Sequence, residues 1–395
     1  MGLGFWQIIL VAVAVAAAVR YLPVLPRRWR VLASVAVILI FACWMPFTVG
    51  TFKTSQMATV ATWAIVAIGL NILTGYNGQI SLGHGAFVTI GAYTAAILTD
   101  NKEHLGFIDA SAWPFWLAVM AAGVVAAAAG FAVGVPALRL SGPYLAVASL
   151  GLVLALPPVL AKYDGLTGGR LGIRVPQPQP PELLSDLINR DQWFFFLALV
   201  TMALMAILAW LIVRSRWGRA FVAVRDSEVA AMAVGIPVAR YKVMAFTVSA
   251  FYGGVAGGIF MTTIGLITPE SVSIILSINY FTAIVIGGLG SIMGSIIGGF
   301  ILVFLPDLST DAAKVFFGAQ QGKQLWPTVY GAILIGVIIL MPHGVAGFVH
   351  RFERFRPAHV AQAAKGLPGA MRRTLQRFSW AWDIRPGGRK GAGKS

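Results

Sequence analysis

The 395-residue chain is 58% hydrophobic, only 11% charged and strongly basic, with a formal net charge of +16. Soluble domains carry about 25% charged residues, and an ionised side chain at the centre of a bilayer costs several kcal/mol. The composition therefore excludes a soluble enzyme and predicts a polytopic membrane protein. The single cysteine, Cys43, lies in an apolar run, which excludes a disulfide framework and a cysteine-based metal site.

Apolar stretches set the expected crossings, because about 17–25 apolar residues span a bilayer as a helix. The first, Met1 to Val19, lacks the basic start and cleavage site of a secretory signal, so we expect a transmembrane helix. Region 272–305 is too long for one crossing and is predicted to cross twice, with a tight turn near Gly287 to Gly290. The other expected spans are 31–47, 57–75, 84–99, 112–134, 143–161, 193–213, 243–263 and 325–341. The sequence thus predicts an all-α, polytopic transmembrane helix bundle of about 11 crossings, in a range of about 8–11.

Lysine and arginine gather in every second loop between the predicted crossings. Because short cytoplasmic loops are enriched in these residues, their placement gives the orientation. With the amino terminus outside, 22 of the 30 Lys and Arg residues lie in loop 20–30, at Arg139, in loop 214–242 and after Met341. The carboxyl terminus is then cytoplasmic. Membrane topology, not nucleic-acid binding, explains the positive charge.

Glycines recur at four-residue spacing in two of the predicted spans. Small residues let helices approach closely in lipid, where van der Waals contact drives their association. We therefore expect these positions to be the packing faces of a compact bundle. The first set is Gly290, Gly294 and Gly298, and the second is the pairs Gly253/Gly257 and Gly254/Gly258.

The most polar segment at membrane depth runs from Gly69 to Tyr93. Polar groups there must bond to protein or water, and non-helical backbone is tolerated only where it is buried in protein or lines a cavity. The segment is predicted either to be a broken or re-entrant helix lining a substrate pathway, or a tight cytoplasmic turn with polar helix ends. The candidate pathway residues are Asn71, Thr74, Asn77, Gln79, Ser81 and His84.

The loop 214–242 contains a short predicted helix. Asp226 or Ser227 can cap its first turn, and the acidic Asp226 and Glu228 suit the positive end of its dipole. Gly235 ends it. A short, Ala-rich cytoplasmic helix with a small-residue face is of the kind that enters a groove on a partner protein. The alternative is a solvated helix that rests on the lipid headgroups.

Four segments carry a resemblance to one family, and they agree in order. They are NILTGYNGQISLGHGAFVTIGAYTAAIL, WGRAFVAVRDSEVAAMAVGIPVARYKVMAF, IVIGGLGSIMGSIIGG and MPHGVAG. Over residues 57–347 the chain resembles the LivM-type permease subunit of branched-chain amino acid ABC importers. The resemblance implies a bacterial inner-membrane subunit without a cofactor. Its partners would be a second, LivH-like permease, two cytoplasmic ATPase subunits and an extracytoplasmic substrate-binding protein.

In such importers a cytoplasmic loop transmits ATP-driven closure, and its usual pattern is Glu-Ala-Ala, three residues, then Gly. This chain matches the pattern with one inserted residue, Val229, and lacks the usual Ile-x-Leu-Pro continuation. The resemblance implies a coupling role for this loop. Its expected coupling residues are Arg219, Asp226, Glu228, Ala230, Ala231 and Gly235.

The chain is expected to have three parts: N-terminal helices with a basic loop (1–56), a permease core (57–347) and a basic tail (348–395). The tail mixes arginines with aromatic residues, which fits either a segment on anionic lipid heads or disorder. It closes with Gly388 to Ser395, which matches the phosphate-loop pattern. Without a following helix to direct its amides, we expect no nucleotide site there.

Three rival functions stay open. A permease of the same type for urea or short amides differs only in its substrate. An ion-coupled secondary transporter needs an intramembrane titratable site, which only His84 and nearby carbonyls supply, because no predicted span centre carries Lys, Arg, Asp or Glu. An exporter or lipid-linked scaffold needs no coupling loop. No paired carboxylates, nucleophile set or metal-ligand cluster is expected, so we predict no catalytic residue and no metal site.

Overall fold

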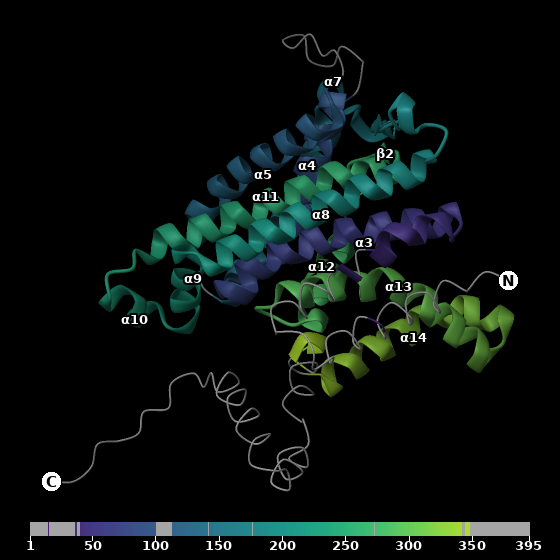
Figure 1. The fold of residues 1–395 in the computed structure, drawn as a ribbon. Helices are drawn as coiled ribbons and strands as arrows, with labels where there is room; N and C mark the ends of the chain where they lie inside the picture. Colours follow the sequence, from purple (N-terminus) through teal and green to yellow (C-terminus); the bar gives the residue numbers. More distant parts are fainter. Residues whose placement is uncertain are drawn as a thin grey trace, which may run out of the picture. The chain divides into compact units, whose positions relative to one another are not determined.

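The computed structural model describes residues 15, 36, 37, 40–99, 113–140, 142–175, 177–271, 273–341 and 344–347. Within these residues nearly all regular structure is helical (Figure 1), which confirms the predicted fold class. The helices lie in one compact unit that ends at Ala346. Almost all of the first expected crossing, part of the second (31–35, 38 and 39) and the tail 348–395 lie outside the described residues.

The helices follow the predicted spans in order. The long ones are α3 (Thr51–Asn71), α4 (His84–Thr99), α5 (Phe115–Ala137), α6 (Pro143–Lys162), α8 (Arg190–Arg214), α11 (Val238–Ile264), α12 (Ile274–Gly287), α13 (Ile292–Phe317) and α14 (Ala319–Leu340). The short elements are α7 (Asp164–Thr167), α9 (Arg216–Asp226), α10 (Glu228–Ala233), a π-helical turn (Ile72–Tyr76), three 3-10 turns (Met45–Phe47, Gly169–Leu171, Glu182–Leu184) and the strands β1 (Ile173–Arg174) and β2 (Leu266–Ile267).

Seven helical stretches in the described part of the chain are long and apolar enough to cross a membrane. Two further apolar helices are shorter: α4 has 16 residues and α12 has 14. At 1.5 Å per residue they rise about 24 Å and about 21 Å, less than the hydrocarbon core of about 30 Å. Each of these two helices is therefore shorter than the hydrocarbon core, and the structure does not confirm about 11 full crossings.

Region 272–305 forms two helices joined by a turn, as predicted. Gly288 and Gly290 both have positive φ in that turn, a conformation that glycine adopts at no steric cost. The second helix, α13, does not end near 305 but continues to Phe317. The prediction was wrong at this end because hydropathy marks where a span leaves lipid, whereas a helix continues into water wherever its backbone stays paired.

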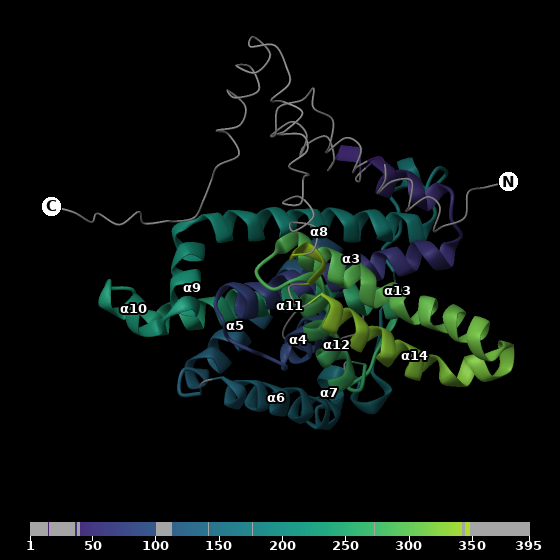
Figure 2. The same ribbon diagram turned by 90° about the horizontal axis from the view of Figure 1, so that it is seen from below.

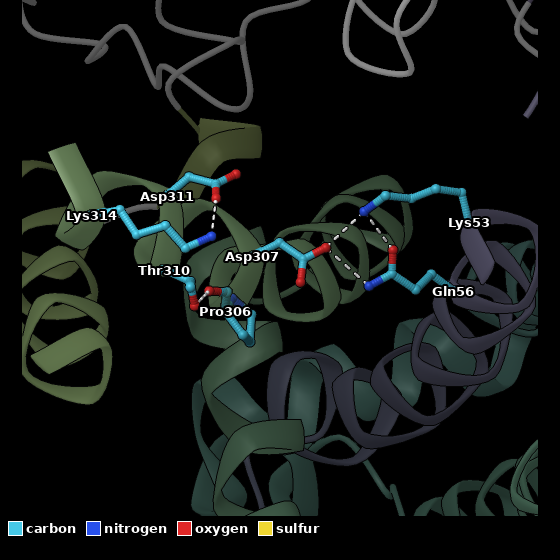
Figure 3. Close-up of polar contacts among 7 residues, drawn as sticks. All are labelled: Lys53, Gln56, Pro306, Asp307, Thr310, Asp311 and Lys314. Carbon is cyan, nitrogen blue, oxygen red and sulfur yellow. Dashed lines mark hydrogen bonds and ion pairs between the residues drawn. The ribbon is translucent and has the colours of Figure 1, made fainter. Parts of the chain in front are cut away.

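The extension of α13 carries a polar cluster that contacts α3 (Figure 3). Lys53 Nζ lies 2.8 Å from Asp307 Oδ2, and Gln56 Nε2 donates to the same oxygen at 3.0 Å. Asp311 and Lys314 form a second ion pair, along α13 itself. Partly exposed ion pairs are worth about 0–1 kcal/mol, so this cluster fixes the alignment of the two helices more than it stabilises them.

The core lies around α3 and α11, which are the most buried of the membrane-length helices. α11 packs against α5, α4 and α3, and α3 packs in turn against α13 and α8. α13 and α14 run side by side in both views (Figures 1 and 2), and no residue of α14 from Gln324 to Leu340 is buried.

The two glycine pairs of α11 pack against different neighbouring helices. A Cβ at Gly257 would overlap the Val88 carbonyl of α4, whereas one at Gly254 would overlap the Ala122 carbonyl of α5. The ridge of α13 packs on α12, since a Cβ at Gly298 would overlap the Ala283 carbonyl. The predicted packing role is confirmed for the glycines of α11 and for Gly294 and Gly298, because side chains are excluded where two helix backbones touch. Gly290 instead lies in the turn with positive φ, and a Cβ there would make only ordinary contacts.

Candidate coupling site

The predicted helix break lies between α3 and α4. α3 widens into the π-helical turn Ile72–Tyr76, and the chain from Asn77 to Gly83 is not helical. π-turns are frequent at functional sites. The break contacts α9, because the Arg225 side chain bonds the Gly75 carbonyl within it. It also lies near the α12–α13 turn, because Asn71, directly before the π-turn, bonds the Gly288 carbonyl of that turn.

Asn71 connects α3 to the α12–α13 turn. Its amide nitrogen donates to the carbonyls of Gly288 and Ser291 and to Ser295 Oγ, at 3.2, 3.0 and 2.7 Å. Its oxygen accepts from the Gly290 amide at 2.8 Å. The side chain is 1% exposed, so all its hydrogen bonds are made to protein. A fully paired buried amide of this kind fixes helix positions.

We expect Asn71→Leu to lower the free energy of unfolding by at least about 2 kcal/mol. The change removes the partner of the Gly290 amide and of the Gly288 carbonyl in a buried site, at about 1–3 kcal/mol for each unsatisfied group, while the Ser291 carbonyl keeps its bonds from Ser295. Thr62→Val is the matched control, because buried Thr62 bonds only the Ala58 carbonyl of its own helix. Unfolding in detergent, followed by size-exclusion chromatography, measures both. Equal destabilisation by the two changes would contradict the inference that Asn71 holds α3 against the α12–α13 turn.

Three of the other predicted pathway residues form one cluster. Thr74 Oγ1 donates to the Gln79 carbonyl at 2.9 Å, and Gln79 Nε2 donates to Asn77 Oδ1. The same nitrogen donates to the Lys242 carbonyl of α11 at 3.1 Å. All three residues are buried. The cluster therefore holds the folded break against the start of α11.

The remaining two lie apart from that cluster. Ser81 is buried and its Oγ accepts from the Gly83 amide, while the neighbouring Leu82 amide donates to Ser149 Oγ of α6. His84 is fully buried, its ring packs edge-on against Phe87, and neither ring nitrogen has a hydrogen-bond partner among the described residues. The six candidates thus do not converge on one point. Their pathway role stays a prediction.

α9 and α10 project at one end of the bundle (Figure 2). Ser227 caps α10 by accepting from the Ala230 amide at 3.2 Å, which confirms one of the two predicted caps. Gly235 has φ +79 and ends α10, and its neighbour Ile236 donates to the Ala231 carbonyl at 3.0 Å. Such a left-handed glycine satisfies the last carbonyls of a helix.

The exposed face of α10 is apolar. Val229 is 74% exposed and Met232 57%, and Val234 just beyond the helix is 76% exposed. Ala231 is buried, so the second alanine of the Glu-Ala-Ala pattern packs inward. The inserted Val229 therefore faces outward with Met232, which the sequence did not indicate. A compact, exposed apolar face on a short helix fits a groove on another protein.

Two charged residues tie α9 and α10 to the rest of the bundle. Arg225 Nη1 donates to the Gly75 carbonyl of the π-turn at 2.9 Å, while Asp226 Oδ1 accepts from its Nε and Nη2. Lys242 Nζ pairs with Glu228 Oε1 at 2.7 Å. Arg219, an expected coupling residue, bonds only locally to the Arg214 carbonyl.

In the sequence, Arg225 and Lys242 are identified only as charges of a cytoplasmic loop. No sequence pattern could identify their roles, because the partner of Arg225 is a backbone carbonyl 150 residues away and that carbonyl is free only because the helix breaks there.

Comparison with known proteins gives a consistent result. The family described as branched-chain amino acid transport system / permease component matches residues 54–341. The chain is 34% identical over 298 residues to the high-affinity branched-chain amino acid transport system permease protein LivM of Escherichia coli K12, covering 70% of this chain and 68% of that protein. It is 30% identical to LivH of the same strain and 27% identical to BraD of Pseudomonas aeruginosa, and each alignment covers 73% of this chain and 92% of the relative. No solved structure matches.

Proposed function

The chain belongs to the family of permease components of branched-chain amino acid transport systems, and on that premise we propose that it is a membrane subunit of an ATP-driven importer. It is a transporter subunit, not an enzyme. ATP hydrolysis belongs in this proposal to separate cytoplasmic subunits, which dock on the exposed apolar face of α10. The exposed apolar face formed by Val229, Met232 and Val234 is the observation that carries the proposal.

The end of the bundle that bears α10 is the cytoplasmic end in this proposal. Basic residues gather there: Arg214, Arg216, Arg219, Arg225, Arg240 and Lys242 all belong to α8, α9 or the start of α11. The enrichment of cytoplasmic loops in Lys and Arg supports this orientation. The small sheet of β1 and β2 lies at the ends of helices that point the other way, toward the binding protein.

The second permease is a related but different chain. Support comes from the similarity of this chain to both LivM and LivH, two permeases named for the same kind of transport system in one strain. The exposed apolar helices that one chain leaves uncovered, α14 above all, supply surface for lipid and for that second subunit.

The proposed substrate is a branched-chain amino acid. Relatives named for branched-chain amino acid transport support this assignment. In this proposal, the ends of the short helices α4 and α12 and the polar groups of the helix break hold the carboxylate and the ammonium group of the substrate. Asn71, Thr74, Asn77, Gln79, Ser81 and His84 are the proposed pathway residues.

Reconstitution tests this function. The chain, purified in mild detergent with the subunits that accompany it and placed in proteoliposomes with its binding protein, should take up labelled leucine only when ATP is supplied. Uptake of urea in preference to leucine would redirect the substrate to short amides. Uptake driven by an ion gradient without ATP, and abolished by an ionophore, would overturn the proposal in favour of a secondary transporter.

A further inference from the structure

Arg225 lies where three parts of the described bundle meet. Its guanidinium bonds the π-turn at Gly75 O, and its aliphatic stem packs on Gly78, where a Cβ would lie 2.9 Å from Arg225 Cγ. On the third side, a Cβ at Gly290 of the α12–α13 turn would lie 3.7 Å from Arg225 Nη1. One side chain of α9 therefore touches the helix break and the turn that Asn71 clamps.

The bond to Gly75 is made because the helix ends there. The carbonyls of Ile72, Leu73 and Thr74 accept from the amides of Asn77, Gln79 and Gly78, so they are paired within the segment. The Gly75 carbonyl instead accepts from Arg225. A cation at the carboxyl end of a helix is favoured by the helix dipole, and a bond from a charged donor is stronger than a neutral one.

Asp226 fixes the direction of the guanidinium. Both Nε and Nη2 donate to Asp226 Oδ1, at 3.0 and 2.9 Å, which leaves Nη1 to reach the Gly75 carbonyl. The planar guanidinium can make these bonds together, whereas the single ammonium of lysine cannot reproduce the fork. The next residues after Asp226 are the cap and first turn of α10.

We propose that Arg225 is a positioning residue that carries movement of α10 into the helix break, so that closure of the ATPase subunits reshapes the segment 72–83. The inference rests on the proposed function. The hydrogen bond from Arg225 connects α9 and α10 directly to the break, in addition to the covalent connection of α10 with α11. A second tie supports it: Glu228 of α10 pairs with Lys242, whose carbonyl accepts from Gln79 of the break.

The test compares Arg225→Ala with Arg216→Ala in the full importer complex. Arg216 is an exposed arginine of the same helix, and no hydrogen bond or ion pair is found for it among the described residues. We expect Arg225→Ala to reduce ATP-driven leucine uptake at least tenfold while ATP hydrolysis stays within twofold of the unaltered complex. Arg216→Ala should keep both activities.

Hydrogen exchange with mass spectrometry then distinguishes a coupling role of Arg225 from one in which it only pairs the free carbonyl of the π-turn. In the unaltered complex, ATP with vanadate should change exchange in peptides from α10 and from 72–83. In Arg225→Ala the change in α10 should persist and the change in 72–83 should disappear. A retained ATP-dependent change in 72–83, or uptake equal to that of Arg216→Ala, overturns the inference. Loss of hydrolysis together with uptake also overturns it, by assigning Arg225 to docking.

If Arg225→Ala fails to fold, Arg225→Lys decides. It keeps the charge near Gly75 but loses the fork with Asp226, so uptake should fall about three- to tenfold with unchanged hydrolysis. Normal uptake per ATP in this variant overturns the inference. Failure of the proposed function itself would show in the unaltered chain, as leucine uptake that does not depend on ATP.

Discussion

Gly91→Ala is expected to destabilise the bundle, and the same substitution at Gly151 is expected to stabilise it. A Cβ at Gly91 of α4 would overlap the backbone of Gly254 on α11, whereas no atom lies within 4 Å of a Cβ at Gly151 of α6. Overpacking costs about 1–3 kcal/mol, and backbone cannot rotate out of the way as a side chain does. Alanine in an open helical position gains about 0.5–1 kcal/mol over glycine.

The measurement is the apparent Tm of each variant in detergent, read as the loss of the folded peak in size-exclusion chromatography. Gly91→Ala should fall by several degrees and yield less folded protein, while Gly151→Ala should equal or exceed the unaltered chain. Shifts of the same sign would show that α4 and α11 are not in backbone contact.

Val229→Asp is expected to bring ATP-driven uptake to background while the chain still inserts and folds. Val229 is 74% exposed on α10, so the change does not disturb the core. A central apolar contact contributes about 2 kcal/mol or more to binding, which corresponds to about a 30-fold weaker Kd. A buried, unpaired carboxylate in the groove of the ATPase adds a desolvation cost to that loss.

Leu187→Asp is the matched control for docking. Leu187 is 72% exposed and lies between α7 and α8, at the opposite end from α10 in the proposed topology. The variant should retain the co-purified ATPase activity that Val229→Asp loses. If Val229→Asp keeps that activity, α10 is not the docking helix, and the cytoplasmic role of α9 and α10 must be reassigned.

The fold connects the exposed residues of α10 to the glycines that pack in the centre of the bundle. α11 starts next to α10, at the end of the bundle proposed for docking, and continues into the centre of the bundle, where its glycines touch α4 and α5. α4 in turn begins at His84, directly after the break. A movement at α10 can therefore reach the same helices through covalent continuity, through close glycine packing and through the bonds at Arg225 and Lys242.

The sequence by itself determined the features that depend on local composition. Apolar runs located α4, α5 and α6 to within a few residues, because the cost of exposing backbone and charge to lipid acts at every position. Glycines located the turn between α12 and α13, and a side-chain oxygen followed by an Ala-rich run limited the cap of α10 to Asp226 or Ser227, of which the structure has Ser227. The loop pattern likewise located the short helix α10, whose role in docking is our proposal.

Only the tertiary structure decided which groups meet. Asn71, selected as a pathway residue for its polarity, bonds residues 217–224 positions away and clamps the α12–α13 turn. Ala231 packs inward while Val229 faces out, and Arg225 finds a carbonyl that is free only because α3 ends there. Hydropathy and capping are properties of a few neighbouring residues, whereas a hydrogen-bond partner is selected by the packing of helices far apart in the chain.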